Sequence, residues 1–412
     1  MRRLRSPIEA SVARTVMSRP DRVAQGRERR RGTALCLSGG GFRAAIFHLG
    51  AMLRLQRAGR LAGVEAISAV SGGSLAAAWL ACCYLDRRRA EESFADWCIR
   101  CDFLAEVVEP FRAVAARDLR TWPVLLTLAW NWRWPSTRVS LLQRRFDAIL
   151  GGRELRDLPA TPNFVFCATD LTFGVNWEFS RRRCGDFQAG YLRRHGKIPL
   201  ATAVTASACF PPLFGPMRLD LKAEDFLRGR HRSEFADHLR DRIELSDGGV
   251  YDNLATEPVI KSAAEILVSD AGAPFPFVAG GHVLRRLLRH ASVIGNQAVA
   301  LRKRLLFRGL RDGEYTGAYW SLDERDPGAP GYSPGLSRDL LARVRTDLDG
   351  FGDAEFEVLV NHGYFSCLSA IEPGRDAAWP FPDRSDEAAV RHALRGSHRR
   401  LWPPRWWQNR GR

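Results

Sequence analysis

The chain has 412 residues, of which 45% are hydrophobic and 26% are charged. This length and composition exclude a disordered chain or a fibre, and they predict one large folded domain or two smaller ones. The formal net charge is +16, and it rests almost entirely on arginine, which supplies 58 of the 62 basic residues.

The positive charge is concentrated at the two ends of the chain. Residues 1–32 carry ten arginines and three acidic residues, and residues 391–412 carry seven arginines and no acidic residue. Each end therefore has a net charge of +7, which leaves only +2 for residues 33–390. We expect a basic arm over 1–32, a folded domain over 33–390 and a basic tail rich in tryptophan and proline over 391–412.

Nine cysteines without disulfide-like spacing indicate a reducing compartment. Cys98 and Cys101 lack a second pair to complete a zinc site, so we expect no metal, and we expect no cofactor. The N-terminus lacks the apolar stretch of a secretory signal. The uncharged run over 66–85 is interrupted at 71–74 by Ser-Gly-Gly-Ser, which predicts a strand, a turn and a helix instead of a membrane span. We therefore expect a cytoplasmic protein.

The first elements in chain order alternate between strand and helix. Apolar patterns predict strands over 34–37 and 64–70 and helices over 42–56 and 75–85. The two strands of such a unit run parallel, and ligands bind at their C-terminal ends.

Three later strands are expected over 164–168, 243–245 and 266–268, each followed within two residues by an aspartate. Between the early and late strands, residues 86–160 contain five tryptophans, and we interpret this segment as a helical cap inserted over the sheet. A helix over 283–310 carries seven basic residues among its leucines and no acidic residue. Its pattern fits a membrane interface or a surface helix packed on the sheet, and both interpretations stay open.

Residues 38–44, Ser-Gly-Gly-Gly-Phe-Arg-Ala, connect the first strand to the first helix. Free backbone N–H groups and the positive end of a helix dipole meet at such a turn, so it suits an oxyanion hole or a phosphate. Gly39, Gly41 and Ala44 also match the spacing of dinucleotide-binding folds, with Glu65 as the ribose-binding acid. A turn without any ligand is the third interpretation.

Residues 69–73, Ala-Val-Ser-Gly-Gly, end the next strand and resemble a G-x-S-x-G nucleophile elbow. Ala69 stands in the first glycine position but is still small. Ser71 is then expected at the tip of the strand. Because neighbouring parallel strands bring their following turns together, the first turn would supply N–H donors to an intermediate formed on Ser71.

A serine hydroxyl needs a base before it can act as a nucleophile. Asp247 follows a short strand and precedes two glycines, which leave its carboxylate uncovered, although aspartate before glycine is also common in ordinary turns. Asp270 and Asp170 are the competing candidates. None of the nine histidines lies in a recognisable local motif, so the sequence favours a carboxylate partner over a Ser/His/Asp triad.

The ordered motifs at 38–44, 69–73 and 247–249 resemble those of the patatin-like phospholipase family. The first motif is especially similar to that of cytosolic phospholipases of the A class. Further similarity at 168–171 and 206–211 extends the resemblance over roughly 33–310. Two residues depart from the family pattern, because Ser38 replaces the aspartate of the plant branch and Ala69 replaces a glycine.

The resemblance implies a three-layer α/β/α fold with a mainly parallel central sheet and a Ser/Asp dyad without a catalytic histidine. Ser71 would be the acyl nucleophile and Asp247 its base, and Arg43 would either hold a substrate phosphate or brace the turn. The implied oxyanion hole consists of the backbone amides of Gly39, Gly40 and Gly41.

The expected activity is that of a serine acyl hydrolase, which cleaves fatty-acyl esters of phospholipids or lysophospholipids through an acyl-enzyme. The basic ends would attach it peripherally to an anionic membrane, and we rank nucleic acid below membrane as their partner. Two alternatives remain. One is a dinucleotide-binding oxidoreductase that uses the turn at 39–41, and the other is a non-catalytic adaptor for membrane or nucleic acid.

Overall fold

The computed structural model describes residues 30–119, 135–210, 214–227, 238–275, 283–323, 325–346 and 348–397. The basic arm up to residue 29, the tail from residue 398 and the tryptophan cluster at 122–134 lie outside these described residues.

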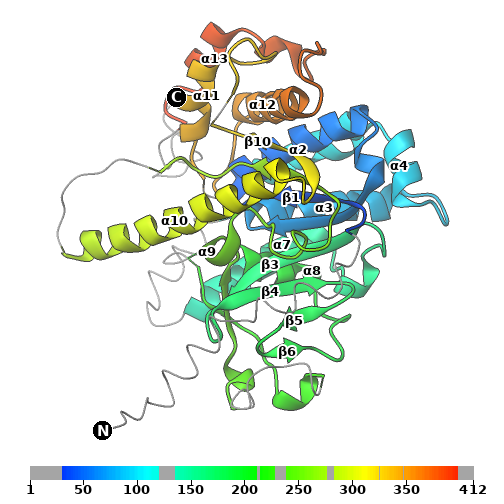
Figure 1. Cartoon of the computed structure of the whole chain (residues 1–412), viewed down its shortest axis with the longest axis vertical. Helices are drawn as coiled ribbons and strands as arrows, with labels where there is room; N and C mark the ends of the chain where they lie inside the picture. Colours follow the sequence, from blue (N-terminus) through cyan, green and yellow to red (C-terminus); the bar gives the residue numbers. More distant parts are fainter. Residues whose placement is uncertain are drawn as a thin grey trace, which may run out of the picture.

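Ten strands form one mixed sheet in the centre of the molecule (Figure 1). The strands are β1 (Thr33–Leu37), β2 (Val64–Val70), β3 (Asn163–Asp170), β4 (Val175–Ser180), β5 (Cys184–Asp186), β6 (Gly190–Tyr191), β7 (Met217–Arg218), β8 (Glu244–Asp247), β9 (Glu265–Asp270) and β10 (Thr316–Ser321). Along the sheet the order is β10-β9-β1-β2-β3-β4-β5-β6, and β8 pairs with β3 and β7. The five strands from β10 to β3 are all parallel.

The main helices are α2 (Gly41–Arg57), α3 (Gly72–Arg87), α4 (Phe94–Arg100), α5 (Glu109–Ala115), α7 (Pro135–Leu150), α8 (Leu200–Ser207), α9 (Gly249–Asp252), α10 (Val283–Arg311), α11 (Pro334–Asp339), α12 (Asp353–Ile371) and α13 (Glu387–Ala393). The first two strands and helices therefore confirm the alternation predicted from the sequence.

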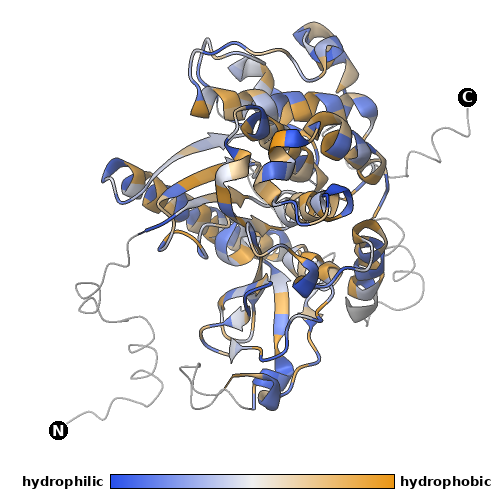
Figure 2. Ribbon diagram, turned by 90° about the vertical axis from the view of Figure 1, so that its right-hand side faces the viewer, coloured by the Kyte–Doolittle hydropathy of each residue, from blue (hydrophilic) through white to orange (hydrophobic). Residues whose placement is uncertain are grey.

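Strand β1 is buried on both faces, because helices cover the sheet from both sides. Leu35 and Leu37 belong to the large core beneath α2, α3 and α12, whereas Ala34 and Cys36 pack with Leu306 of α10 on the opposite face. Successive side chains of a strand point to opposite faces, so this division places β1 between two apolar layers. Figure 2 shows the hydrophobic residues concentrated in the sheet and the helices around it. The α/β class and its parallel central strands confirm the predicted fold.

The short strand β8 continues the position of β2 along one edge of β3. Residues 168–170 of β3 pair antiparallel with β4 on one edge, so the pairing of the same residues with β8 must occupy the other edge. That edge is shared with β2, which pairs with residues 163–167. Strands β2 and β8 therefore approach each other end to end, and their C-terminal ends meet.

The described part of the predicted cap packs closely on the body. Trp97, Phe111 and Phe146 are buried in the main core with α2 and α3. The division of the chain into a domain and a cap over 86–160 stays a prediction. Within the described ranges, no helix has the length and hydrophobicity needed to cross a membrane.

Candidate active site

Ser71 lies at a strained turn between β2 and α3. Its φ of 53° and ψ of −118° fall outside the regions that residues with a side chain ordinarily adopt. The Ser71 amide donates a hydrogen bond to Ser207 Oγ at 2.9 Å. This sharp turn leaves the side chain half-buried at the tip of the strand, which is the geometry of a nucleophile elbow.

The two glycines after Ser71 press the elbow against the first glycine turn. A Cβ on Gly72 would lie 2.1 Å from the carbonyl oxygen of Gly41, and a Cβ on Gly73 would lie 2.4 Å from that of Leu37. Neither position has room for a side chain. The sequence pattern of small residues around the serine therefore brings the two turns into direct backbone contact.

The first turn presents two backbone N–H groups at the start of α2. Gly40 has φ 145° and Gly41 has φ 63°, which glycine adopts readily. Among the described residues neither amide has a hydrogen-bond acceptor, whereas the Gly39 amide donates to the carbonyl of Asn253 at 3.2 Å. Of the three predicted oxyanion-hole donors, Gly39 is therefore occupied, and Gly40 and Gly41 are available.

Asp247 is the carboxylate that lies beside the Ser71 side chain. It ends β8, is buried, and accepts a hydrogen bond from the Gly249 amide at 2.7 Å, and the Ser71 side chain lies close enough to act on its carboxylate as a donor. Burial raises the pKa of Asp247 to about 6, although the Gly249 amide and the Ser71 side chain act in the opposite direction. A carboxylate with a pKa in this range is suited to accept and return a proton near neutral pH.

The competing aspartates have other partners. Asp270 accepts hydrogen bonds from Lys303 Nζ at 2.7 Å and from the Tyr319 hydroxyl at 2.7 Å. Burial alone would raise the pKa of Asp270, but Lys303 holds it below its usual value. Asp170 accepts the Thr172 amide at 2.6 Å and faces Asp186. Of these three aspartates, Asp247 is the one whose pKa the Ser71 side chain lowers.

No histidine in the described ranges makes a hydrogen bond to Ser71 or Asp247. The buried His48 instead supports the first turn, because its Nε2 contacts the carbonyl of Ser38 at 2.9 Å and its Nδ1 contacts Ser269 Oγ at 2.8 Å. Burial lowers the pKa of His48 to about 4, so the ring is neutral and Nε2–H donates to the carbonyl. The ring therefore serves as a support rather than as a base.

Arg43 lies inside the protein and braces the first turn. Its guanidinium is fully buried and donates to the backbone carbonyls of Ala342 at 2.6 Å, Val344 at 3.0 Å and Ala271 at 2.8 Å. Burial lowers the pKa of Arg43 to about 10. Of the two roles predicted for this arginine, the contacts favour the brace, because the donors that would hold a substrate phosphate already bind protein carbonyls.

Two further residues support the site and were not predicted from the sequence. Ser207 Oγ accepts the Ser71 amide, contacts Ser74 Oγ at 2.8 Å and donates to the carbonyl of Cys167 at 2.6 Å. Asn253, six residues after Asp247, accepts the Gly39 amide. Ser207 lies in the recognised motif at 206–211, but its contacts depend on three segments that are distant in the sequence.

The geometry contradicts the dinucleotide alternative. Glu65 was its expected ribose-binding acid, yet this residue lies at the start of β2, whereas the glycine turn follows the end of the parallel neighbour β1. Its carboxylate lies beside Gly32, at the far end of the sheet from the turn. A ribose held near residues 39–41 is therefore out of its reach.

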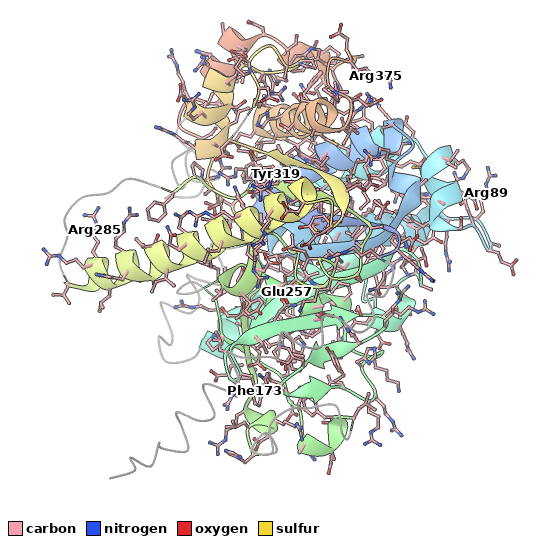
Figure 3. All side chains as sticks on the ribbon, viewed as in Figure 1. Arg89, Phe173, Glu257, Arg285, Tyr319 and Arg375 are labelled. Atoms are coloured by element: carbon pink, nitrogen blue, oxygen red, sulfur yellow. The ribbon has the colours of Figure 1, made fainter. Side chains whose placement is uncertain are left out.

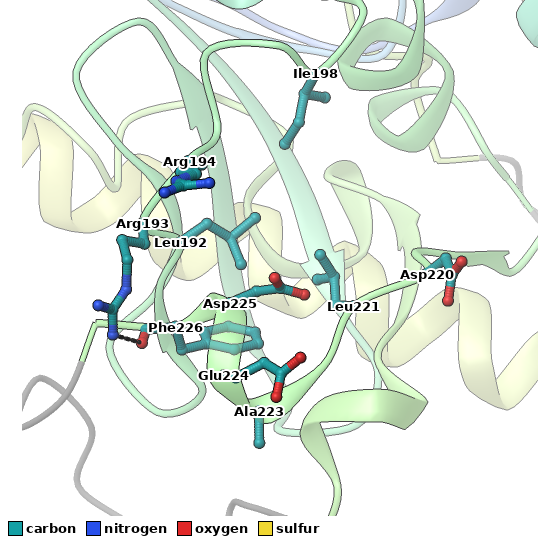
Figure 4. A pocket seen from close by; sticks show the side chains of 10 residues that line it. All are labelled: Leu192, Arg193, Arg194, Ile198, Asp220, Leu221, Ala223, Glu224, Asp225 and Phe226. Carbon is teal, nitrogen blue, oxygen red and sulfur yellow. Dashed lines mark hydrogen bonds between the residues drawn. The ribbon is translucent and has the colours of Figure 1, made fainter.

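A pocket of about 560 Å³ lies next to the segments that follow β6 and β7 (Figure 4). Leu192, Arg193, Asp225 and Phe226 are among the residues that line it. Ser71 and Asp247 do not line this pocket, so it is separate from the candidate active site.

The α/β fold has a serine on a strained elbow with a buried carboxylate beside it, and the two neighbouring amides have no acceptor among the described residues, an arrangement that serine hydrolases use. A family model described as "Patatin-like phospholipase" matches residues 35–260, which is more than half of the chain. The chain belongs to the patatin-like phospholipase family.

Several solved structures are similar at low identity. Human GIVD cytosolic phospholipase A2 is 15% identical with a TM-score of 0.48, over 95% of this chain and 63% of that chain. Its complex with methyl gamma-linolenyl fluorophosphonate gives 16% identity and a TM-score of 0.47, over 89% and 59%. VipD from Legionella pneumophila gives 13% and 0.34, over 82% and 66%. The chain thus spans less than two thirds of each of these structures, and no curated protein matches it.

Proposed function

We propose that the protein is a serine acyl hydrolase that cleaves fatty-acyl esters of phospholipids or lysophospholipids. The observation that carries this proposal is the placement of the Ser71 side chain beside the buried Asp247 carboxylate at a strained elbow, next to the Gly40 and Gly41 amides, which have no acceptor among the described residues. Membership of the patatin-like phospholipase family supports a lipid ester as the substrate.

The first half of the reaction acylates the serine. Asp247 accepts the hydroxyl proton while Ser71 Oγ attacks the ester carbonyl carbon, and the negative charge that develops on the carbonyl oxygen faces the amides of Gly40 and Gly41. The N-terminal ends of α2 and α3 converge at this point, so their dipoles favour the same charge. Collapse of the tetrahedral intermediate breaks the ester C–O bond, and Asp247 returns its proton to the departing alcohol oxygen.

In the second half of the reaction, water is the nucleophile and Ser71 Oγ is the leaving group. Asp247 takes a proton from the attacking water, the oxyanion forms again at the same amides, and the proton returns to Ser71 Oγ as the fatty acid leaves. The raised pKa of Asp247, about 6, suits a group that must both accept and donate the proton.

Labelling with a fluorophosphonate probe tests the nucleophile, because such a probe forms a stable bond only with an activated serine. We expect the wild-type protein to be labelled and Ser71→Ala to remain unlabelled with an unchanged melting temperature. Ser74→Ala is the matched control, because this second serine lies three residues away on α3, is buried and contacts Ser207. Equal labelling of the wild type and Ser71→Ala would reject Ser71 as the nucleophile.

If the protein is instead a non-catalytic adaptor, we expect no labelling and no ester hydrolysis in any variant.

The cytoplasmic location and the attachment of the basic ends to anionic membranes stay predictions, since most of both ends lies outside the described residues.

A further inference from the structure

Helix α10 is fixed to the body mainly at its C-terminal half. Arg302 pairs with Glu257, Lys303 Nζ lies 2.7 Å from Asp270 Oδ2, and Leu306 is buried under the sheet. The N-terminal half extends away from the sheet (Figure 1). Arg285 marks this outer end, where its side chain points away from the body (Figure 3).

A stripe of aliphatic side chains runs along the exposed side of α10. Its members are Val283, Leu287, Ile294, Leu301 and Leu305, each between 53% and 74% exposed. At 3.6 residues per turn these positions fall within an arc of about 40°. A helix that only covers the sheet would turn its aliphatic residues inward, so this outward stripe calls for a partner surface.

Cations border the stripe. Arg286, Arg304 and Arg308 lie on one side of it, within about 60° of its edge on the helical wheel. The whole helix contains eight arginines and lysines and no acidic residue. The partner surface should therefore be apolar where it contacts the aliphatic stripe and negatively charged where it contacts the flanking arginines.

We propose that this stripe, Val283 to Leu305, docks on an anionic lipid surface. The aliphatic side chains would enter the boundary between headgroups and acyl chains, and the flanking arginines would contact the negative headgroups. A second copy of the chain fits poorly, because self-pairing through the stripe would bring the arginines of two helices together, and α10 contains no acidic residue, although Arg308 pairs with Asp312 just beyond the helix.

The anchored end of α10 connects the docking surface to the active site. Lys303 holds Asp270, and the next residue, Ala271, accepts a hydrogen bond from Arg43 and lies beside Gly40. On the other side, Arg302 stacks on Tyr251 of α9, the short helix that follows Asp247. A docked helix would thus hold the catalytic turns in a set position over the lipid, a step that rests on the proposed function.

Cosedimentation of the full chain with vesicles tests the docking surface. We expect binding to vesicles of phosphatidylcholine with phosphatidylglycerol, weaker binding to phosphatidylcholine alone, and weaker binding at high salt. Ile294→Asp should reduce the affinity for the anionic vesicles about tenfold or more. Ile99→Asp is the matched control, because Ile99 of α4 is 74% exposed and Ile294 is 71% exposed. Melting curves of both variants check the fold.

Equal vesicle binding by Ile294→Asp and Ile99→Asp overturns the proposal, and so does wild-type protein that fails to bind anionic vesicles. If light scattering shows a dimer that Ile294→Asp dissociates, the stripe is a contact between copies and the proposal is also wrong. Ser71→Ala should bind vesicles like the wild type, so a failure of the docking surface is distinguishable from a failure of the proposed reaction.

Discussion

Ser71 and Asp247 meet because two strands end against each other along the same edge of β3. Val70, the last residue of β2, is paired with Cys167, and Asp247, the last residue of β8, is paired with Ala168. The proposed nucleophile follows the residue paired with Cys167, and the proposed base is paired with the next residue of the same strand, Ala168. Their relative position depends on the sheet rather than on a loop, as a direct proton transfer between the two side chains requires.

Asp247→Asn should inactivate the enzyme and stabilise the fold at neutral pH. The pKa of Asp247 is about 6 in the folded protein, against 3.8 for an ordinary aspartate. Because the folded value is the higher one, ionisation of Asp247 destabilises the fold progressively as the pH rises from 3.8 to about 6, and the cost is absent below the unfolded value. A shift of this size corresponds to at most roughly 3 kcal/mol. We expect a higher melting temperature for the variant at pH 7.5 and a vanishing difference near pH 3.5.

Asp270→Asn is the control with the opposite sign. The pKa of Asp270 is held low by Lys303, so loss of its charge should destabilise the protein at neutral pH. If Asp270→Asn abolishes ester hydrolysis and Asp247→Asn retains it, the base has been assigned to the wrong strand.

Hydrolysis of a soluble short-chain ester should increase as the pH rises through about 6. Asp247 must be ionised to accept the Ser71 proton, and its raised pKa places that ionisation within reach of ordinary buffers. A pH profile of kcat/KM measures the transition directly. A plateau that extends down to pH 4 would contradict a base with this pKa.

Gly72→Ala should disrupt the contact between the two catalytic turns. The added Cβ would lie 2.1 Å from the Gly41 carbonyl, so one turn must move. Overpacking of this kind costs about 1–3 kcal/mol, and displacement of the Gly41 amide should also lower kcat. Denaturant unfolding and ester hydrolysis measure both effects.

Gly63→Ala serves as the matched control for this substitution. Apart from its own chain neighbours, a Cβ at Gly63 would have no atom within 4 Å, so the stability of the protein should change by less than about 0.5 kcal/mol. Equal stability and activity of the two variants would show that the turns need no close contact.

Arg43→Gln should lower the melting temperature and impair neutral and phosphorylated esters to the same extent. The substitution leaves the carbonyls of Ala342, Val344 and Ala271 without their buried donor. The measurement is the ratio of kcat/KM for a phospholipid to that for a neutral lipid ester. A variant that folds like the wild type and has a raised KM for the phospholipid only would assign Arg43 to substrate phosphate instead.

Local patterns predicted the elements around the site, and non-local pairing determined how they meet. The strands and helices up to residue 87 follow from apolar periodicity and glycine turns, which act over a few residues. The antiparallel placement of β8 beyond the end of β2 depends on pairing between β3 and residues about 80 positions later, which periodicity does not encode.

The finer properties of the site likewise depended on contacts that are distant in sequence. The occupation of the Gly39 amide requires Asn253, and the enclosure of Arg43 requires carbonyls near residue 342. The amphipathic character of α10 was predictable from its sequence. The outward direction of its aliphatic stripe was not, because it depends on which face packs against the sheet.

In the proposed reaction, the acyl group is bound covalently to Ser71 before water releases it. Mixing the protein with an activated short-chain ester, quenching with acid within the first turnover and analysing the peptides by mass spectrometry would trap this intermediate. We predict that the added mass of the acyl group lies on Ser71 in the wild type and is absent from Ser71→Ala. Ester turnover with the acyl group on another residue, or with no acylated peptide at any time, would contradict the proposed mechanism.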